Sequence, residues 1–206
     1  MQRFTATLVA EGSSDQALVP FIEFVLDAHC TIPHVTTFAN DLPKGALSER
    51  IAQALRLHPC DLLFVHRDAD RATVAEREQE IRDAALTAGK DLVVCVIPVR
   101  MTEAWLLFDE QAIRNAAGNP NGRQDLQLPE PARCESIPDP KEVLHRAIQV
   151  ASELPGRRRA KLSVPERVHR VAHGIDDFSP LLGLPSFRAL QEDVATFISG
   201  YSDLGN

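Results

Sequence analysis

Long apolar runs and paired cysteines are both missing from this chain. None of its 206 residues belongs to a continuous apolar stretch of about 18, so we expect no membrane-spanning helix and no membrane partner. The opening residues 1–5 lack the apolar run of a secretory signal. The cysteines form no Cys-x-x-Cys pair and lie mostly in apolar segments, at Cys30, Cys60, Cys95 and Cys134. This usage predicts reduced core cysteines in a cytoplasmic protein.

The glycine motifs of several large enzyme classes are also absent. The sequence has no Gly-x-Gly-x-x-Gly, no Gly-x-x-x-x-Gly-Lys-Ser/Thr loop and no Gly-x-Ser-x-Gly elbow. Their absence removes the usual signatures of dinucleotide binding, ATP binding and serine hydrolysis. If an ATPase takes part in the function, we expect it to be a separate partner subunit.

Short apolar runs alternate with amphipathic segments over the first two thirds of the chain. Runs that read as strands cover residues 4–10, 34–39, 61–66 and 92–99. Helical spacing or composition follows them at residues 14–26, 46–57, 73–88 and 102–116. Pro20 is awkward inside the first of these helices, because proline removes a backbone hydrogen bond. The alternation predicts an α/β fold with a mainly parallel sheet flanked by helices.

The composition changes near residue 118. Prolines, glycines and amides dominate residues 118–140, which predicts a loop or lid. The remainder is helical in pattern, with prolines near the predicted helix starts. We therefore expect an α/β domain over residues 1–117, the proline-rich segment 118–140, and a helical extension over residues 141–206 that packs on the core.

Acidic residues follow three of the predicted strands: Glu11 after the first, Asp68 and Asp70 after the third, and Glu103 after the fourth. Open α/β sheets bind ligands at the carboxyl ends of their strands. Neighbouring carboxylates repel one another unless a proton or a cation neutralises them, and Mg²⁺ does so through oxygen ligands. Each acid alone also fits an ordinary turn. Their recurrence at successive strand ends favours a metal site.

The order of these motifs resembles the TOPRIM domain. That domain has an apolar strand ending in Glu-Gly, here Glu11-Gly12, and a later strand ending in Asp-x-Asp, here Asp68-Ala69-Asp70. It occurs in topoisomerases, primases and nucleases of the overcoming-lysogenization-defect type. The Glu-Ala-Trp-Leu-Leu stretch at residues 103–107 also resembles a bacterial family of TOPRIM-like proteins with a helical tail. Members of that family are often encoded beside ABC-type ATPases in antiphage or toxin-like systems.

The resemblance implies a Mg²⁺-dependent nuclease, with Mn²⁺ as a substitute, that hydrolyses DNA or RNA. Glu11 would be a metal ligand or general acid/base, and Asp68 and Asp70 would be metal ligands, the three together forming the catalytic set. Glu103 would add a ligand or orient one. Asp15 stands where some nuclease members have Glu, so its shorter side chain leaves the second metal in question. An ABC-type ATPase is the implied partner in a defence system, and self-association stays open.

Net charge is −7, but residues 141–170 carry eight Lys/Arg against three acids. A basic segment on an acidic body would hold a phosphate backbone near the metal site, although such runs are often solvated helix faces. The candidates for nucleic-acid binding are Arg71, beside the acidic pair, and the cluster Arg157, Arg158, Arg159 and Lys161. His169 and His173, spaced i, i+4, lack a third metal ligand.

Three neighbouring residues have structural interpretations beside the functional ones. His66 reads as a buried core histidine and Trp105 as core packing. Arg67 reads as either a phosphate contact or an ion-pair partner of Asp68, Asp70 or Glu103. Two other functions compete with the nuclease. One is a haloacid-dehalogenase-type phosphohydrolase, although Thr73 stands one residue too far from Asp70 for its motif. The other is a non-catalytic scaffold that binds an ATPase.

Overall fold

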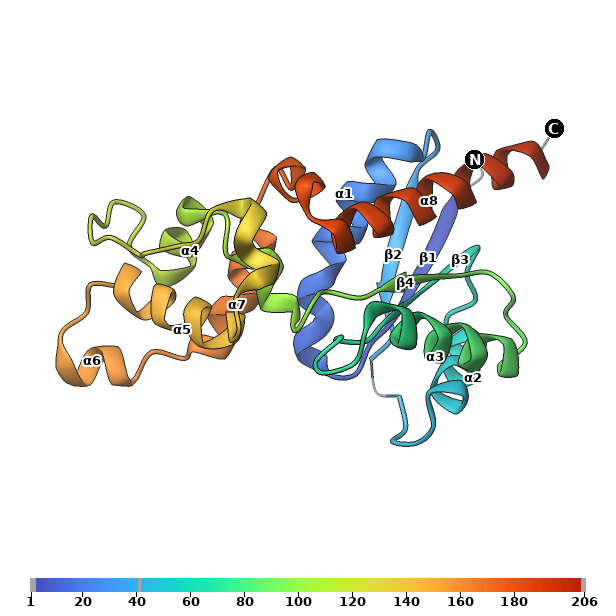
Figure 1. The fold of residues 1–206 in the computed structure, drawn as a ribbon, viewed down its shortest axis with the longest axis horizontal. Coiled ribbons are helices and arrows are strands. Elements are labelled where there is room, and N and C mark those ends of the chain that lie inside the picture. The colour runs from blue at the N-terminus through green and yellow to red at the C-terminus, as the bar shows by residue number, and fades with distance from the viewer. Residues whose placement is uncertain (1–2, 41, 205–206) are drawn as a thin grey trace.

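The computed structural model describes residues 3–40 and 42–204 of the chain. Within them, four parallel strands form one sheet in the order β2-β1-β3-β4 (Figure 1). The strands are β1 (Phe4–Val9), β2 (His34–Phe38), β3 (Leu62–His66) and β4 (Val93–Val96). This confirms the predicted α/β class with a parallel sheet.

The strand register brings the carboxyl ends of β1, β3 and β4 to one edge of the sheet. Val9 of β1 is paired with Val65 of β3, and His66 of β3 is paired with Val96 of β4. Every residue of β3 and β4 is buried. This is the burial expected of continuous apolar strands that helices cover on both faces.

Helices flank the sheet on its two faces (Figure 1). Successive strand residues alternate between the two cores, so that Phe64 packs with α1 and α8 while Leu63 and Val65 pack with α2 and α3. The bounds of these helices are α1 Val19–His29, α2 Leu47–Leu57, α3 Val74–Thr87 and α8 Pro185–Leu204.

A helical lobe lies beside the sheet and contains α4, α5, α6 and α7 (Figure 1). These helices span α4 Glu110–Ala117, α5 Pro140–Ala151, α6 Gly156–Ala160 and α7 Val164–His173. The grouping in space differs from the division by composition at residues 117 and 140, because α4 packs against α5 and α7, and α8 returns to the sheet. No helix of the described residues is long and apolar enough to cross a membrane.

Two predicted helices are divided in ways that local chemistry explains. The first begins as a 3₁₀ turn, η1 (Ser13–Leu18), so Pro20 lies in the first turn of α1, where its missing N–H costs no helix bond. The helix expected over 102–116 is split into η2 (Thr102–Leu106) and α4, because the Asp109 side chain accepts a hydrogen bond from the Ala112 N–H and caps a new start.

Two further short helices are present. The proline-rich segment, predicted as a loop or lid, contains η3 (Pro131–Ser136), and η4 (Ser179–Gly183) precedes α8 in the predicted helical extension. Trp105 joins these parts: its side chain is fully buried, and its Nε1–H lies 3.3 Å from Glu135 Oε1 and 3.2 Å from Ser186 Oγ. The predicted packing role of Trp105 is therefore confirmed.

Candidate acidic site at the carboxyl edge of the sheet

The segment that carries Asp68 and Asp70 runs beside the extension of β4. Hydrogen bonds continue the pairing past the end of β3, from Ala69 N–H to Pro98 O and from Asp70 N–H to Arg100 O, each 3.3 Å. The segment ends abruptly, since Asp70 has φ +51° and Arg100 has φ +68°. Left-handed backbone costs a non-glycine residue about 1–3 kcal/mol, and such strain collects at functional sites.

Five carboxylates gather around this edge. The four acids at positions 11, 15, 70 and 103 all lie close enough to Asp68 to raise the pKa of its carboxyl group. Burial is the largest cause and the neighbouring negative charges follow, and together they raise that pKa from 3.8 to about 7. The structure thus brings together every acid that the sequence analysis assigned to the site: Glu11, Asp15, Asp68, Asp70 and Glu103.

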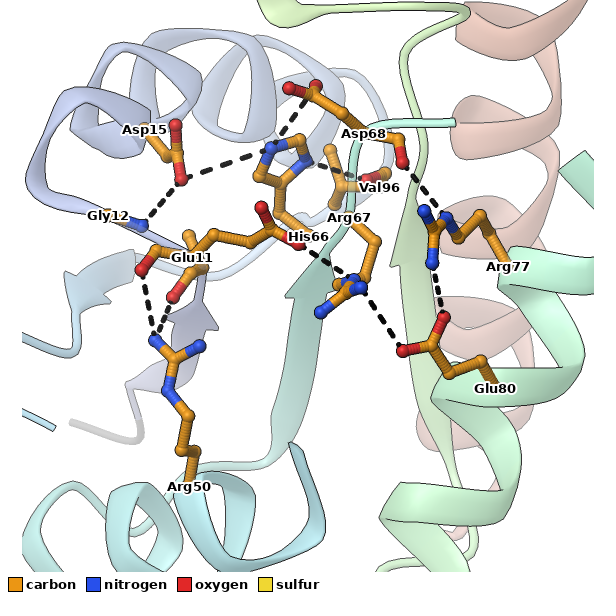
Figure 2. A network of polar contacts seen from close by, with 11 residues as sticks. Glu11, Gly12, Asp15, Arg50, His66, Arg67, Asp68, Arg77, Glu80 and Val96 are labelled. Atoms are coloured by element: carbon orange, nitrogen blue, oxygen red, sulfur yellow. Dashed lines mark hydrogen bonds and ion pairs between the residues drawn. The ribbon is translucent and has the colours of Figure 1, made fainter. Parts of the chain in front are cut away.

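His66 lies beneath the acids at the end of β3 and is 1% exposed. Its Nδ1 is 2.9 Å from the carbonyl oxygen of Val96, and because a carbonyl only accepts, Nδ1 must carry the proton. Nε2 faces the site, 3.5 Å from Asp68 Oδ1 and 4.0 Å from Asp15 Oδ2 (Figure 2). Burial lowers the pKa of His66, so the neutral ring presents Nε2 as an acceptor toward Asp68.

The expected core histidine is therefore buried, with one of its two ring nitrogens satisfied by the backbone. A neutral Nε2 opposite a carboxylate is stable only when a proton or a cation lies between the two groups. The raised pKa of Asp68 is consistent with a proton there. The protonation of Asp68 therefore depends on its contact with the buried His66 ring.

Asp15 reaches the cluster despite being shorter than the Glu found in some TOPRIM nucleases. Its Oδ2 accepts a hydrogen bond from the Gly12 N–H at 2.9 Å, which holds the turn after β1 closed. Its side chain is 14% exposed and faces His66 and Asp68. Asp15 can therefore contribute to the site without moving the backbone of η1.

Two arginines fix Glu11 from opposite sides (Figure 2). Arg67 Nε lies 2.8 Å from Glu11 Oε1, and Arg67 Nη2 lies 3.3 Å from Oε1 of Glu80 in α3. Arg50 of α2 donates to the backbone carbonyls of Ala10 and Glu11. Arg67 is thus an ion-pair partner, as one of its two predicted roles required, but its partners are Glu11 and Glu80, and Glu80 had not been singled out in the sequence.

Arg77 of α3 completes this support. Its Nε–H donates to the Asp68 backbone carbonyl at 3.1 Å, and its Nη1 lies 2.7 Å from Glu80 Oε2 (Figure 2). Glu80 consequently bridges Arg67 and Arg77, which are bound to the two strand ends that carry Glu11 and Asp68. Side chains locked by such a surrounding network hold their positions with little freedom.

Glu103 comes from η2. Its side chain is 16% exposed, and Oε1 lies 3.9 Å from Lys141 Nζ of α5. The neighbouring Thr102 is 7% exposed, and its Oγ1 is buried without a hydrogen-bond partner among the described residues. Lys141 is the cation that the helical lobe supplies to this edge of the sheet.

The donor set fits a hard divalent cation in its chemistry. Within residues 3–40 and 42–204, no three His, Cys, Asp or Glu side chains are arranged, as they lie, to hold a metal ion. Asp68 Oδ1 is buried and accepts no hydrogen bond from the described residues, which leaves an acceptor without a donor. Clustered carboxylate oxygens with unmet acceptor capacity are the ligands that Mg²⁺ and Mn²⁺ prefer.

The predicted nucleic-acid contacts fall in two places. Arg71 lies next to the acids and lines a pocket of about 460 Å³ together with Arg77 and Arg100. The basic cluster at residues 157–161 is exposed on and just after α6, at the end of the helical lobe away from the sheet (Figure 1). Arg71, Arg77 and Arg100 therefore share a pocket with Asp70, whereas the α6 cluster would meet only a substrate that extends across the lobe.

A second pocket, not predicted from the sequence, is lined by Glu103. It measures about 300 Å³ and is lined in part by Ser13, Glu103, Lys141, His145 and His169. Two histidines from different helices meet there because α5 packs against α7. The i, i+4 spacing within α7 suggested a different pair, and only the tertiary packing joins positions 145 and 169.

Thr73 is occupied with a structural task. Its hydroxyl oxygen accepts a hydrogen bond from the Glu76 N–H at 3.2 Å and caps α3. This capping role of Thr73 does not favour the phosphohydrolase alternative.

Comparisons with protein-family models, curated proteins and solved structures found no match to the chain.

Proposed function

We propose that this protein is a divalent-metal-dependent nuclease with a TOPRIM-like site, cutting phosphodiester bonds of DNA or RNA. The observation that carries the proposal is the carboxyl group of Asp68. Four other carboxylates surround it, its Oδ1 accepts no hydrogen bond from the described residues, and its pKa is raised to about 7. Carboxylates gathered around an acceptor oxygen that has no donor are suited to a divalent cation.

Asp15, Asp68 and Asp70 would hold the cation, with Glu103 as an additional oxygen ligand. Mg²⁺ or Mn²⁺ bound there supplies polarisation of a phosphoryl oxygen and a lowered pKa of bound water. The arginines at positions 71 and 100 line the adjoining pocket and would balance the charge of the phosphate.

Glu11 would act as the general base. Its side chain is 44% exposed, against 14% for Asp15, 26% for Asp68 and 16% for Glu103, and Arg67 orients it at 2.8 Å. In the reaction a water oxygen attacks phosphorus while the bond from phosphorus to the leaving oxygen breaks. The proton of that water passes to Glu11, and the leaving oxygen takes a proton from solvent. The products are one phosphomonoester and one hydroxyl end.

The chain carries no ATP-binding loop motif of its own. An ABC-type ATPase subunit is therefore the proposed partner if cutting is gated by ATP, as the family resemblance implies for antiphage systems. In that setting the protein would be the cutting subunit in the cytoplasm.

The test is cleavage of end-labelled DNA and RNA oligonucleotides with Mg²⁺, with Mn²⁺, and with EDTA. We expect metal-dependent cutting that Asp68→Ala abolishes and that Glu11→Gln reduces by about 10²–10⁴-fold. Asp176→Ala, at an exposed acid of the helical lobe, is the matched control and should cut like the unmodified protein. Cutting that persists in both site variants, or oligonucleotide binding without any cutting, would overturn the proposal and favour a scaffold role.

A further inference from the structure

The 300 Å³ pocket beside the acids lies where the sheet meets the helical lobe. Ser13 contributes from η1, Glu103 from η2, Lys141 and His145 from α5, and His169 from α7. Glu103 is shared with the acidic site, since its charge also raises the pKa of Asp68. A ligand in this pocket would therefore lie beside Glu103, one of the five carboxylates.

The charge of the lining argues against a phosphate as the occupant. Two carboxylates, Glu103 and Glu166, face one ammonium group, and Lys141 already lies 3.9 Å from Glu103. A phosphate site needs an excess of positive charge or of N–H donors. With two carboxylates and one ammonium group, the fixed charges of this pocket disfavour an anionic occupant.

The same residues suit an uncharged, planar, polar-edged group. Pro165 and Val168 give apolar walls, while the serine and histidine side chains and Lys141 donate hydrogen bonds and the carboxylates accept them. A nucleobase has two apolar faces and an edge that carries both donors and acceptors. The volume of about 300 Å³ lies at the small end of ligand pockets, a size for one nucleoside rather than a duplex.

We propose that this pocket receives one unpaired nucleobase of the substrate strand, next to the phosphate that is cut. This rests on the proposed function, and it assigns the substrate class: single-stranded nucleic acid, or a strand end or loop whose base can leave the stack. In a duplex the hydrogen-bonding edge is paired and the faces are stacked, so entry costs unpairing and unstacking. The acidic site alone makes no such distinction.

The experiment is an abasic scan of binding by fluorescence anisotropy. The full chain is titrated, with Ca²⁺ in place of Mg²⁺, against fluorescein-labelled 12-nucleotide single strands that lack one base at successive positions, and against the matched duplex. We expect one position whose missing base weakens binding about tenfold, because a good pair of hydrogen bonds to a base edge contributes about 5–150-fold. The duplex should bind at least tenfold more weakly than the single strand.

Pocket variants connect that position to these residues. Glu166→Gln should change which base is preferred there, whereas Glu142→Gln, at the same first-turn position of α5 but outside the pocket lining, should not. Val168→Trp should fill the pocket and erase the effect of the missing base, with circular dichroism as the check on folding.

The outcomes separate this proposal from the nuclease. A flat abasic scan, equal affinity for duplex and single strand, or no oligonucleotide binding overturns the base pocket, even where cutting is observed. If one position is sensitive and depends on Glu166 but no cutting occurs, the base pocket is supported. Only the proposed nuclease activity is then contradicted.

Discussion

Replacing Asp68 by Asn should make the metal-free protein more stable at neutral pH. Burial and four neighbouring acids raise the pKa of the Asp68 carboxyl group from 3.8 to about 7. The folded state therefore holds a proton that the unfolded chain releases, and stability is lost as pH rises from about 4 to about 7. An uncharged Asn removes this cost, and its N–H can donate toward His66 Nε2, which lies 3.5 Å from Asp68 Oδ1.

The size of the effect follows from that pKa. A rise from 3.8 to about 7 corresponds to an upper limit of about 4 kcal/mol. The side chain is 26% exposed, so solvent screening reduces the expected gain to roughly 1–3 kcal/mol at pH 8. At pH 4.5, where the folded carboxyl group is protonated, the two proteins should differ by less than about 1 kcal/mol.

Urea denaturation in EDTA, at a series of pH values between 4.5 and 8.5, measures this difference directly. Adding Mg²⁺ at about 100 times its dissociation constant should then stabilise the unmodified protein by about 2.7 kcal/mol and Asp68→Asn by much less. The reasoning is refuted if Asp68→Asn is less stable than the unmodified protein at pH 8, or if the difference between them does not change with pH.

Three further predictions concern the core, the helical lobe and the cysteines. Trp105→Ala should lower the free energy of unfolding by about 3–5 kcal/mol, since it empties a fully buried site that joins η3 and α8; a loss under 1 kcal/mol in a urea titration would contradict this packing role. Replacing the arginines at 157–159 by Ala should leave cleavage of a 6-nucleotide strand unchanged, but should lower the slope of log affinity against log salt by about 2 for a long strand. An equal loss on both substrates would instead bring α6 to the cut phosphate. Burial raises the pKa of Cys95 to about 12 and that of Cys134 to about 11, so neither should react with a thiol reagent at pH 8 until the protein is unfolded, and mass spectrometry of the labelled peptides checks this.

The sheet and the acids could be predicted from the sequence because both follow from local patterns. A continuous apolar run such as 61–66 indicates a buried parallel strand, and an acid that follows such a run must lie at the carboxyl edge of the sheet. The position of Pro20 was less accessible, since a 3₁₀ turn before α1 and a longer helix have the same composition. The break at Asp109 has a local signal, because an Asp side chain commonly caps a helix by accepting a hydrogen bond from the N–H three residues later, here that of Ala112.

The supports of the site could not be predicted, because they depend on packing between distant segments. Arg67 is adjacent to Asp68 in the sequence, yet it pairs with Glu11 and with Glu80. The pocket that contains His145 and His169 exists only because α5 and α7 pack together beside the sheet. Neither arrangement has a fixed spacing in the chain that would reveal it.

The most direct test of the metal site is the anomalous scattering of Mn²⁺ in crystals of the protein soaked with that ion. We predict a peak at the carboxyl edge of the sheet, with oxygens of Asp68 and at least one other of the five acids within about 2.0–2.4 Å, and its loss in crystals of Asp68→Ala. No peak at that edge, or a peak held by His145 and His169 instead, would contradict the account.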